Sequence, residues 1–198
     1  RSRLATRRHS TTPCARLYPP GVMADPSAPE ILLDEAGVRA TVEALAERIA
    51  PEIDDETVAV CLLTGGIWFA ADLTRALARR GRLVGFDALW LASYGDSKAS
   101  RGSVEVRAGL QRDVTGKTVL ILDDVFDTGL SLKRAVEIVR GQGADRVLTC
   151  VFASKPWPEP RALTPDFVGW EAPARYLVGY GLDSAGRMRG LPGIAALD

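Results

Sequence analysis

The segment from Val119 to Leu132 constrains the fold most, because it passes from a strand to acids and then to a helix start within a few residues. Its first part, Val-Leu-Ile-Leu, is a continuous apolar run, which is typical of a strand buried on both faces of a parallel sheet. Asp123 and Asp124 follow directly, at the carboxyl end of that strand, where open α/β sheets bind ligands. The sequence therefore predicts a ligand site at this edge of the sheet.

The residue types in this segment suit a sugar phosphate. Adjacent carboxylates can accept hydrogen bonds from two vicinal hydroxyl groups, and a ribose offers such a pair. The next residues, Asp127 to Ser131, supply two hydroxyl side chains and a glycine directly before apolar residues at helical spacing. Backbone N–H groups at such a helix start can converge on an anion, and a phosphate fits that anion best.

Strands and helices alternate along most of the chain. The expected strands are 57–63, 83–94, 104–108, 119–122 and 146–153, and the expected helices are 35–50, 67–80 and 130–140. This alternation predicts an α/β fold with a parallel doubly wound (Rossmann-like) sheet, right-handed crossovers and helices on its faces. We expect strands near 167–170 and 176–180 to form a small hood over the ligand edge, and residues 95–103, which lack a large apolar side chain, to be mobile.

Length and composition indicate one globular domain. The chain has 198 residues, of which 46% are hydrophobic and 25% charged, and these are ordinary values for such a domain. No apolar stretch approaches the roughly 20 residues that a membrane span needs. Outside residues 1–22, 20 Lys and Arg stand against 25 Asp and Glu. An acidic body argues against nucleic-acid binding, which usually needs a basic patch.

Residues 1–22 are expected to lie outside the domain. They hold five arginines and no acid, a composition that also suits a transit peptide. Because Met23 begins the sequence Met-Ala-Asp-Pro, we favour it as the native start and interpret residues 1–22 as a non-native or disordered leader. Residues 23–198 then form the single domain, and the hood comes mainly from the segments around 31–50 and 156–198.

Cysteine and histidine usage excludes several kinds of chemistry. Cys14, Cys61 and Cys150 are too few and too scattered for a zinc site or a disulfide framework, which favours a reducing cytoplasm. Cys61 and Cys150 lie in apolar runs, where a thiol usually fills the core. The one histidine, His9, lies in the leader. Histidine-dependent hydrolysis and histidine-rich metal sites therefore lack an essential group in the domain.

Four segments together resemble the hypoxanthine-guanine branch of the type I phosphoribosyltransferase family. Residues 119–132 are similar to its signature for phosphoribosyl pyrophosphate (PRPP), and residues 62–73 to its first loop and helix. Ser93-Tyr94 is similar to the mobile active-site loop, and residues 165–171 with 176–183 are similar to the purine pocket. The segments occur in the family's order, and the similarity runs from about Ile31 to the C-terminus.

The resemblance implies a purine-salvage enzyme that joins PRPP to hypoxanthine or guanine, giving IMP or GMP and pyrophosphate. The implied residues are Asp127 as general base; Asp123, Asp124, Thr128, Gly129, Leu130 and Ser131 for the ribose and 5′-phosphate; Thr64, Gly65 and Arg189 for pyrophosphate; Lys155, Tyr176 and Leu177 for the purine; Ser93 and Tyr94 in the mobile loop; and Asp183, with Asp123 and Asp124, for Mg²⁺. It also implies a cytoplasmic homodimer or homotetramer whose partners are PRPP and a 6-oxopurine, with no nucleic acid and no membrane.

Several of these roles have a plainer structural alternative. Asp127 could have no role beyond capping the helix that follows it, and Lys155 could be a solvated surface lysine. Tyr176 could be a core side chain, and Tyr94 could have no role beyond packing in the hood. The chain also departs from the family at two positions, since Asp123 stands where many members have glutamate and Ser131 where threonine is usual.

Two other functions are compatible with the same motifs. One is a PRPP-sensing regulator that kept the fold and lost catalysis, although the acidic body and the intact implied residues argue against it. The other is a transferase that prefers xanthine. The sequence does not set the preference among hypoxanthine, guanine and xanthine, the oligomeric state, or the cis or trans state of the Leu63–Thr64 peptide.

Overall fold

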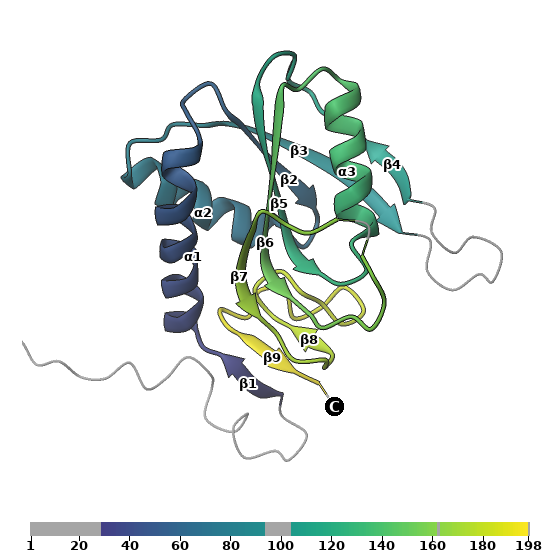
Figure 1. The fold of residues 1–198 in the computed structure, drawn as a ribbon. Helices are drawn as coiled ribbons and strands as arrows, with labels where there is room; N and C mark the ends of the chain where they lie inside the picture. Colours follow the sequence, from purple (N-terminus) through teal and green to yellow (C-terminus); the bar gives the residue numbers. More distant parts are fainter. Residues whose placement is uncertain (1–28, 94–103, 162, 198) are drawn as a thin grey trace, which may run out of the picture.

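The computed structural model describes residues 29–93, 104–161 and 163–197, and a six-stranded sheet lies at its centre (Figure 1). The strand order is β4 (Val104–Ala108), β3 (Gly85–Ser93), β2 (Val58–Leu63), β5 (Thr118–Phe126), β6 (Arg146–Ser154) and β7 (Phe167–Glu171). The pairs from β3 to β7 are parallel, and β4 runs antiparallel to β3 at one edge. The predicted doubly wound parallel sheet is confirmed, with β4 as an antiparallel addition.

Helices cover both faces of this sheet. The helices α1 (Glu35–Ile49) and α2 (Ile67–Arg79) lie on one face, and α3 (Leu130–Gly141) lies on the other (Figure 1). In β5, Leu120 and Leu122 pack in the core with α1 and α2, whereas Val119 and Ile121 pack in the core with α3. Successive side chains of a strand point to opposite faces. The unbroken apolar run of β5 is therefore explained by burial on both sides.

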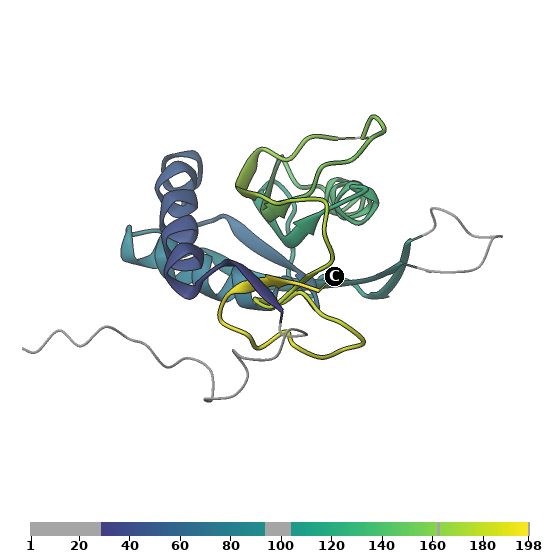
Figure 2. The ribbon, with the colours of Figure 1, turned by 90° about the horizontal axis from the view of Figure 1, so that it is seen from below.

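A second, three-stranded sheet lies beyond the carboxyl ends of the parallel strands (Figures 1 and 2). It consists of β1 (Glu30–Leu33), β9 (Ile194–Ala196) and β8 (Leu177–Val178), in that order. The prediction that residues 167–170 belong to this hood is wrong, because they form β7 and pair with β6 in the main sheet. The carboxylate of Asp166 explains this placement, since it accepts hydrogen bonds from the backbone N–H and the hydroxyl of Thr149 in β6, at 2.8 and 2.7 Å.

The helix α1 packs against α2 and against β7 of the main sheet, and not within the small sheet. A short 3-10 helix, η2 (Ala50–Glu52), follows it. Of the expected hood segment 31–50, only the part in β1 therefore joins the small sheet.

Cys61 and Cys150 are buried in the core as expected, and burial raises the pKa of the Cys61 thiol to about 12.

Several expectations fall outside the described residues, namely those on the leader 1–22 with Cys14 and His9, on Tyr94, and on the segment 95–103. In the part of the chain that the structure does describe, no helix is long and apolar enough to cross a membrane.

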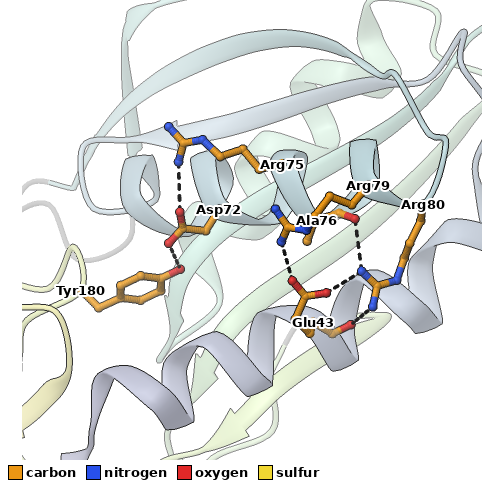
Figure 3. Close-up of polar contacts among 7 residues, drawn as sticks. All are labelled: Glu43, Asp72, Arg75, Ala76, Arg79, Arg80 and Tyr180. Atoms are coloured by element: carbon orange, nitrogen blue, oxygen red, sulfur yellow. Dashed lines mark hydrogen bonds and ion pairs between the residues drawn. The ribbon is translucent and has the colours of Figure 1, made fainter. Parts of the chain in front are cut away.

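Polar contacts join α1, α2 and the C-terminal segment (Figure 3). Glu43 of α1 pairs with Arg79, the last residue of α2, and with Arg80, which follows it. Nearer the start of α2, the Asp72 carboxylate accepts a hydrogen bond at 3.0 Å from the hydroxyl of Tyr180, which follows β8. The Tyr180 ring lies 4.8 Å from the ring of Phe152 in β6. Tyr180 therefore fixes the C-terminal segment to both α2 and the main sheet.

Replacing this hydroxyl tests its contribution. We expect Tyr180→Phe to lower the free energy of unfolding by about 1–2 kcal/mol, because a half-buried carboxylate loses a hydrogen bond while the ring packing stays. Chemical denaturation measures the change. Arg75→Gln is the control, because Arg75 pairs with the other oxygen of Asp72 from a position that is 68% exposed and should contribute little. Equal stability of Tyr180→Phe and the parent would contradict the assigned role.

Candidate active site

A cleft of about 780 Å³ opens at the carboxyl ends of β2 and β5. Four parts of the chain line most of it: the loop after β2 with Thr64 and Gly65, the end of β5 from Asp123 onward, the start of α3, and the C-terminal pair Asp183 and Arg189. The sheet edge predicted to bind a ligand is therefore hollow.

Asp123 and Asp124 lie side by side near the end of β5 and are only partly exposed. The backbone N–H of Asp124 donates to the carboxylate of Asp123 at 3.1 Å. Burial raises the pKa of Asp123 well above its ordinary value, and the neighbouring charge of Asp124 raises it further. Burial also raises the pKa of Asp124, although the side-chain hydrogen bond with Asp123 opposes this. The pair is therefore suited to bind a cation or several hydrogen-bond donors.

The loop after β2 comes very close to these acids. A Cβ at Gly65 would lie 1.8 Å from the Asp124 carboxylate, so a larger residue there would displace this carboxylate. On the other side of the loop, Gly181 has a φ of +99°, and a Cβ on it would lie 2.1 Å from the carbonyl oxygen of Gly65. The peptide between Leu63 and Thr64 is cis. Two glycines thus allow the acids, the loop and the C-terminal segment to meet.

The start of α3 faces the cleft without a side-chain cap from its N-cap residue. That residue is Gly129, with a φ of +80°. Asp127 does not cap the helix, so the alternative that it serves only as a cap is wrong. The Thr128 hydroxyl instead accepts a hydrogen bond from the backbone N–H of Leu130 at 3.3 Å. A helix start of this kind favours an anion through its N–H groups and its dipole.

A smaller cavity of about 210 Å³ adjoins the cleft and shares Asp124, Asp127 and Asp183 with it. Lys155 contributes its ammonium group, which lies 4.0 Å from the carboxylate of Asp127. The Lys155 side chain is only 22% exposed, so the alternative of a solvated surface lysine is wrong. Tyr176 is 54% exposed and is therefore not a core side chain. Its hydroxyl donates to the carbonyl oxygen of Asp183 at 3.1 Å.

Asp183 and Arg189 form an ion pair at 2.7 Å. The second oxygen of Asp183 accepts a hydrogen bond at 2.6 Å from the backbone N–H of Gly186, and the Arg189 guanidinium also donates to the carbonyl oxygen of Gly181. The sequence predicted a site role for each residue but not their pairing. Both side chains are held in the turn that crosses the loop after β2.

The structure brings nearly all of the residues predicted for the site to these two cavities. Leu177 in β8 lines the smaller cavity. Ser93 ends β3, but its side chain lies outside the described part, as does Tyr94. Trp90 and Arg107 were missed, and they line the cleft with the guanidinium 5.6 Å from the indole ring. The alternation of apolar and polar residues in 104–108 predicted a half-exposed strand, but it did not predict that Arg107 would face the cleft.

Among the described residues, no three or more His, Cys, Asp and Glu side chains come together closely enough to hold a metal ion by themselves. Magnesium usually takes one or two carboxylates and completes its shell with water and substrate phosphates. The adjacent carboxylates of Asp123 and Asp124, with Asp183 in the same cleft, fit an ion that binds together with a phosphorylated ligand.

Comparison with known proteins gives consistent results. Residues 31–185 match the family described as phosphoribosyl transferase domain. A hypoxanthine-guanine phosphoribosyltransferase of Aquifex aeolicus is 36% identical over 165 residues, which are 82% of this chain and 91% of that protein. The Bacillus subtilis protein of the same name is 33% identical and covers 85% of this chain and 92% of its own length. A hypoxanthine phosphoribosyltransferase structure from Staphylococcus aureus has a TM-score of 0.79 at 26% identity, over 85% of this chain and 91% of that one.

The raised pKa of Asp123 leads to a prediction about pH. A carboxyl whose pKa is higher in the folded than in the unfolded protein stabilises the fold only while it is protonated, so this contribution is lost as pH rises above about 4 and through the raised value. Without metal or ligand, we therefore expect Asp123→Asn to melt several degrees above the parent at pH 8, and the gain to shrink towards pH 4. Calorimetry in a chelating buffer measures this. A variant that melts at or below the parent at pH 8 would show that the carboxylate pair carries no such cost.

Proposed function

Because the chain belongs to the phosphoribosyltransferase family, we propose that it transfers the phosphoribosyl group of PRPP to hypoxanthine or guanine in purine salvage. The products are IMP or GMP and pyrophosphate. One observation carries this proposal: Lys155 and Asp127 lie 4.0 Å apart in a small cavity that adjoins the acid-lined cleft. A base and a phosphorylated sugar can therefore bind side by side.

The smaller cavity is suited to a 6-oxopurine, which carries O6 and N7 on one edge. The Lys155 ammonium has three donors and no acceptor, and therefore suits O6, whereas the Asp127 carboxylate suits a proton on N7. Tyr176 offers an exposed aromatic face on which a planar base can stack. Leu177 lines the same cavity, where its backbone would meet the edge of the purine.

The larger cleft is suited to PRPP. In this proposal Asp123 and Asp124 hold the ribose hydroxyls, and the start of α3 (Thr128, Gly129, Leu130 and Ser131) holds the 5′-phosphate. Thr64, Gly65 and Arg189 lie at the pyrophosphate end. In support of this division, the loop after β2 and the start of α3 both line the cleft, and the acid pair lies on β5, which pairs with β2 and leads into α3.

We also propose that Mg²⁺ enters with PRPP, held by Asp183 and by the Asp123–Asp124 pair. The ion would supply positive charge to the phosphate oxygens of the leaving group. The support is geometric, since the carboxylates of Asp123, Asp124 and Asp183 line the same cleft. Burial also raises the pKa of the acid pair, and a bound cation would favour the charged carboxylates.

The residues would act mainly by positioning and electrostatics. A purine ring nitrogen forms a bond to C1 of the ribose as the bond from C1 to pyrophosphate breaks. Asp127 accepts the proton from N7, and Lys155 donates to O6, which becomes more negative as that proton leaves. Arg189 donates to the departing pyrophosphate. Ser93 and Tyr94 would close over the site and exclude water.

An assay with the purified protein, PRPP, magnesium and each purine in turn tests the proposal by ultraviolet absorbance. We expect turnover with hypoxanthine or guanine. A PRPP-sensing regulator would bind PRPP without forming nucleotide, and a xanthine-preferring enzyme would show its highest kcat/KM with xanthine. The cytoplasmic location and the homodimer or homotetramer stay predictions, and fractionation and analytical ultracentrifugation test them.

Asp127→Asn tests the general base. The amide keeps the size of the side chain but cannot accept the N7 proton as a carboxylate does, so we expect kcat to fall by roughly 10²-fold or more while the KM for PRPP stays nearly constant. Steady-state kinetics with hypoxanthine measures both constants. Unchanged turnover would rule out a catalytic role for Asp127.

Lys155→Ala tests selection between oxo and amino purines. Adenine places an amino donor where hypoxanthine has O6, so the Lys155 ammonium should favour hypoxanthine by about 30-fold to several thousand-fold. The variant should lose most of its hypoxanthine activity while its adenine activity changes little. Comparison of kcat/KM for the two bases measures this, and the same ratio in variant and parent would show that Lys155 does not select the base.

A further inference from the structure

The ladder between β5 and β6 ends just before the two residues proposed to bind the purine edge. Its last paired residues are Phe126 and Ser154, and one more bond follows, from the backbone N–H of Lys155 to the carbonyl oxygen of Phe126, at 3.0 Å. The carbonyl groups of Asp127 and Lys155 come next, beyond the end of the ladder. Partly buried carbonyl groups need another donor.

Arg161 supplies that donor to both carbonyl groups. Its Nε donates to the carbonyl oxygen of Asp127 at 2.7 Å, and its Nη2 donates to the carbonyl oxygen of Lys155. The guanidinium carbon lies 4.4 Å from the centre of the Phe126 ring, so the planar group also stacks on the end of β5. One half-buried side chain therefore replaces the missing ladder bonds of two strands.

We propose that Arg161 is a positioning residue that fixes the separation of the Asp127 carboxylate and the Lys155 ammonium. Each carbonyl group adjoins the Cα that carries the functional side chain. The rigid Arg161 guanidinium, which bridges the two carbonyl groups, therefore fixes the positions of both Cα atoms. Arginine suits this task because its guanidinium is planar and presents adjacent donors, whereas the ammonium group of lysine is a single compact donor centre. The inference rests on the proposed function of Asp127 and Lys155.

The position of Arg161 also predicts which substrate it affects. Asp123 lies within the ladder, paired with Val151 of β6, and does not depend on Arg161 for its place. Asp127 and Lys155, in contrast, lie past the last strand pair. Loss of Arg161 should therefore impair use of the purine much more than binding of PRPP.

Arg161→Gln and Arg161→Lys test this in the full chain. We expect each to raise the KM for hypoxanthine by about 10-fold and lower kcat by about 10-fold, since a small misplacement of reacting groups costs one to two orders of magnitude. The KM for PRPP should stay within about twofold of the parent. Arg161→Lys keeps the charge, and it should not restore activity because it cannot replace the planar guanidinium. It is also the milder variant if Arg161→Gln folds poorly.

Arg48 provides a matched control. Its guanidinium likewise donates to a backbone carbonyl oxygen, that of Val168, at 3.1 Å, and lies 5.5 Å from the centre of the Phe167 ring. It belongs to α1 and lines neither cavity of the candidate site. Arg48 is more exposed and bonds only one carbonyl group, so Arg48→Gln should lower the melting temperature less than Arg161→Gln and leave all kinetic constants within about twofold of the parent.

A double-mutant cycle completes the test, because Arg161→Gln should have a much smaller effect when Lys155 is already alanine. Three results would overturn the inference: equal rises in the KM for both substrates, parent-like kinetics in Arg161→Gln, or full activity in Arg161→Lys. A parent protein that forms no nucleotide from PRPP and any purine would instead overturn the proposed function, and the role of Arg161 with it.

Discussion

The rest of the site depends on a pair of partly buried carboxylates, Asp123 and Asp124, at the end of a strand whose apolar residues are buried on both faces. Burial raises the pKa of both groups, so the unliganded protein carries an electrostatic cost at neutral pH. Native proteins are stable by only about 5–15 kcal/mol, so a cost of this kind must be offset by the core on either side of β5. A bound cation, together with a ligand that donates hydroxyl hydrogen bonds, would remove this electrostatic cost. Binding would therefore stabilise the fold.

The same carboxylates explain why distant parts of the chain meet where they do. Asp124 lies against Gly65, and Gly65 lies against Gly181, so the end of β5, the loop after β2 and the C-terminal segment converge with almost no space between them. Tyr180, directly before Gly181, is held by Asp72 of α2 and packs on Phe152. The ion pair of Asp183 and Arg189 therefore lines the cleft from a segment that is held by α2 and the main sheet.

Much of the fold could be predicted because its signals are local. The apolar run of β5, the helical spacing in α1 and α3 and the glycines at strand ends are all visible within short windows. The placement of β7 could not be predicted, because an apolar segment after several prolines fits either sheet. The contact that decides it, between Asp166 and Thr149, joins residues far apart in sequence. At the site, residues within contiguous motifs were found, whereas Trp90, Arg107 and Arg161 were not, since their roles come from tertiary contacts alone.

A crystal structure with Mg²⁺, PRPP and an unreactive analogue of hypoxanthine would test the proposed arrangement of substrates in the two cavities. We expect the purine to lie on Tyr176, with O6 within hydrogen-bond distance of the Lys155 ammonium and N7 beside the Asp127 carboxylate. We also expect the ribose hydroxyls at Asp123 and Asp124 and the 5′-phosphate at the start of α3. A purine bound elsewhere, or a 5′-phosphate at the loop after β2 instead of at α3, would contradict this arrangement.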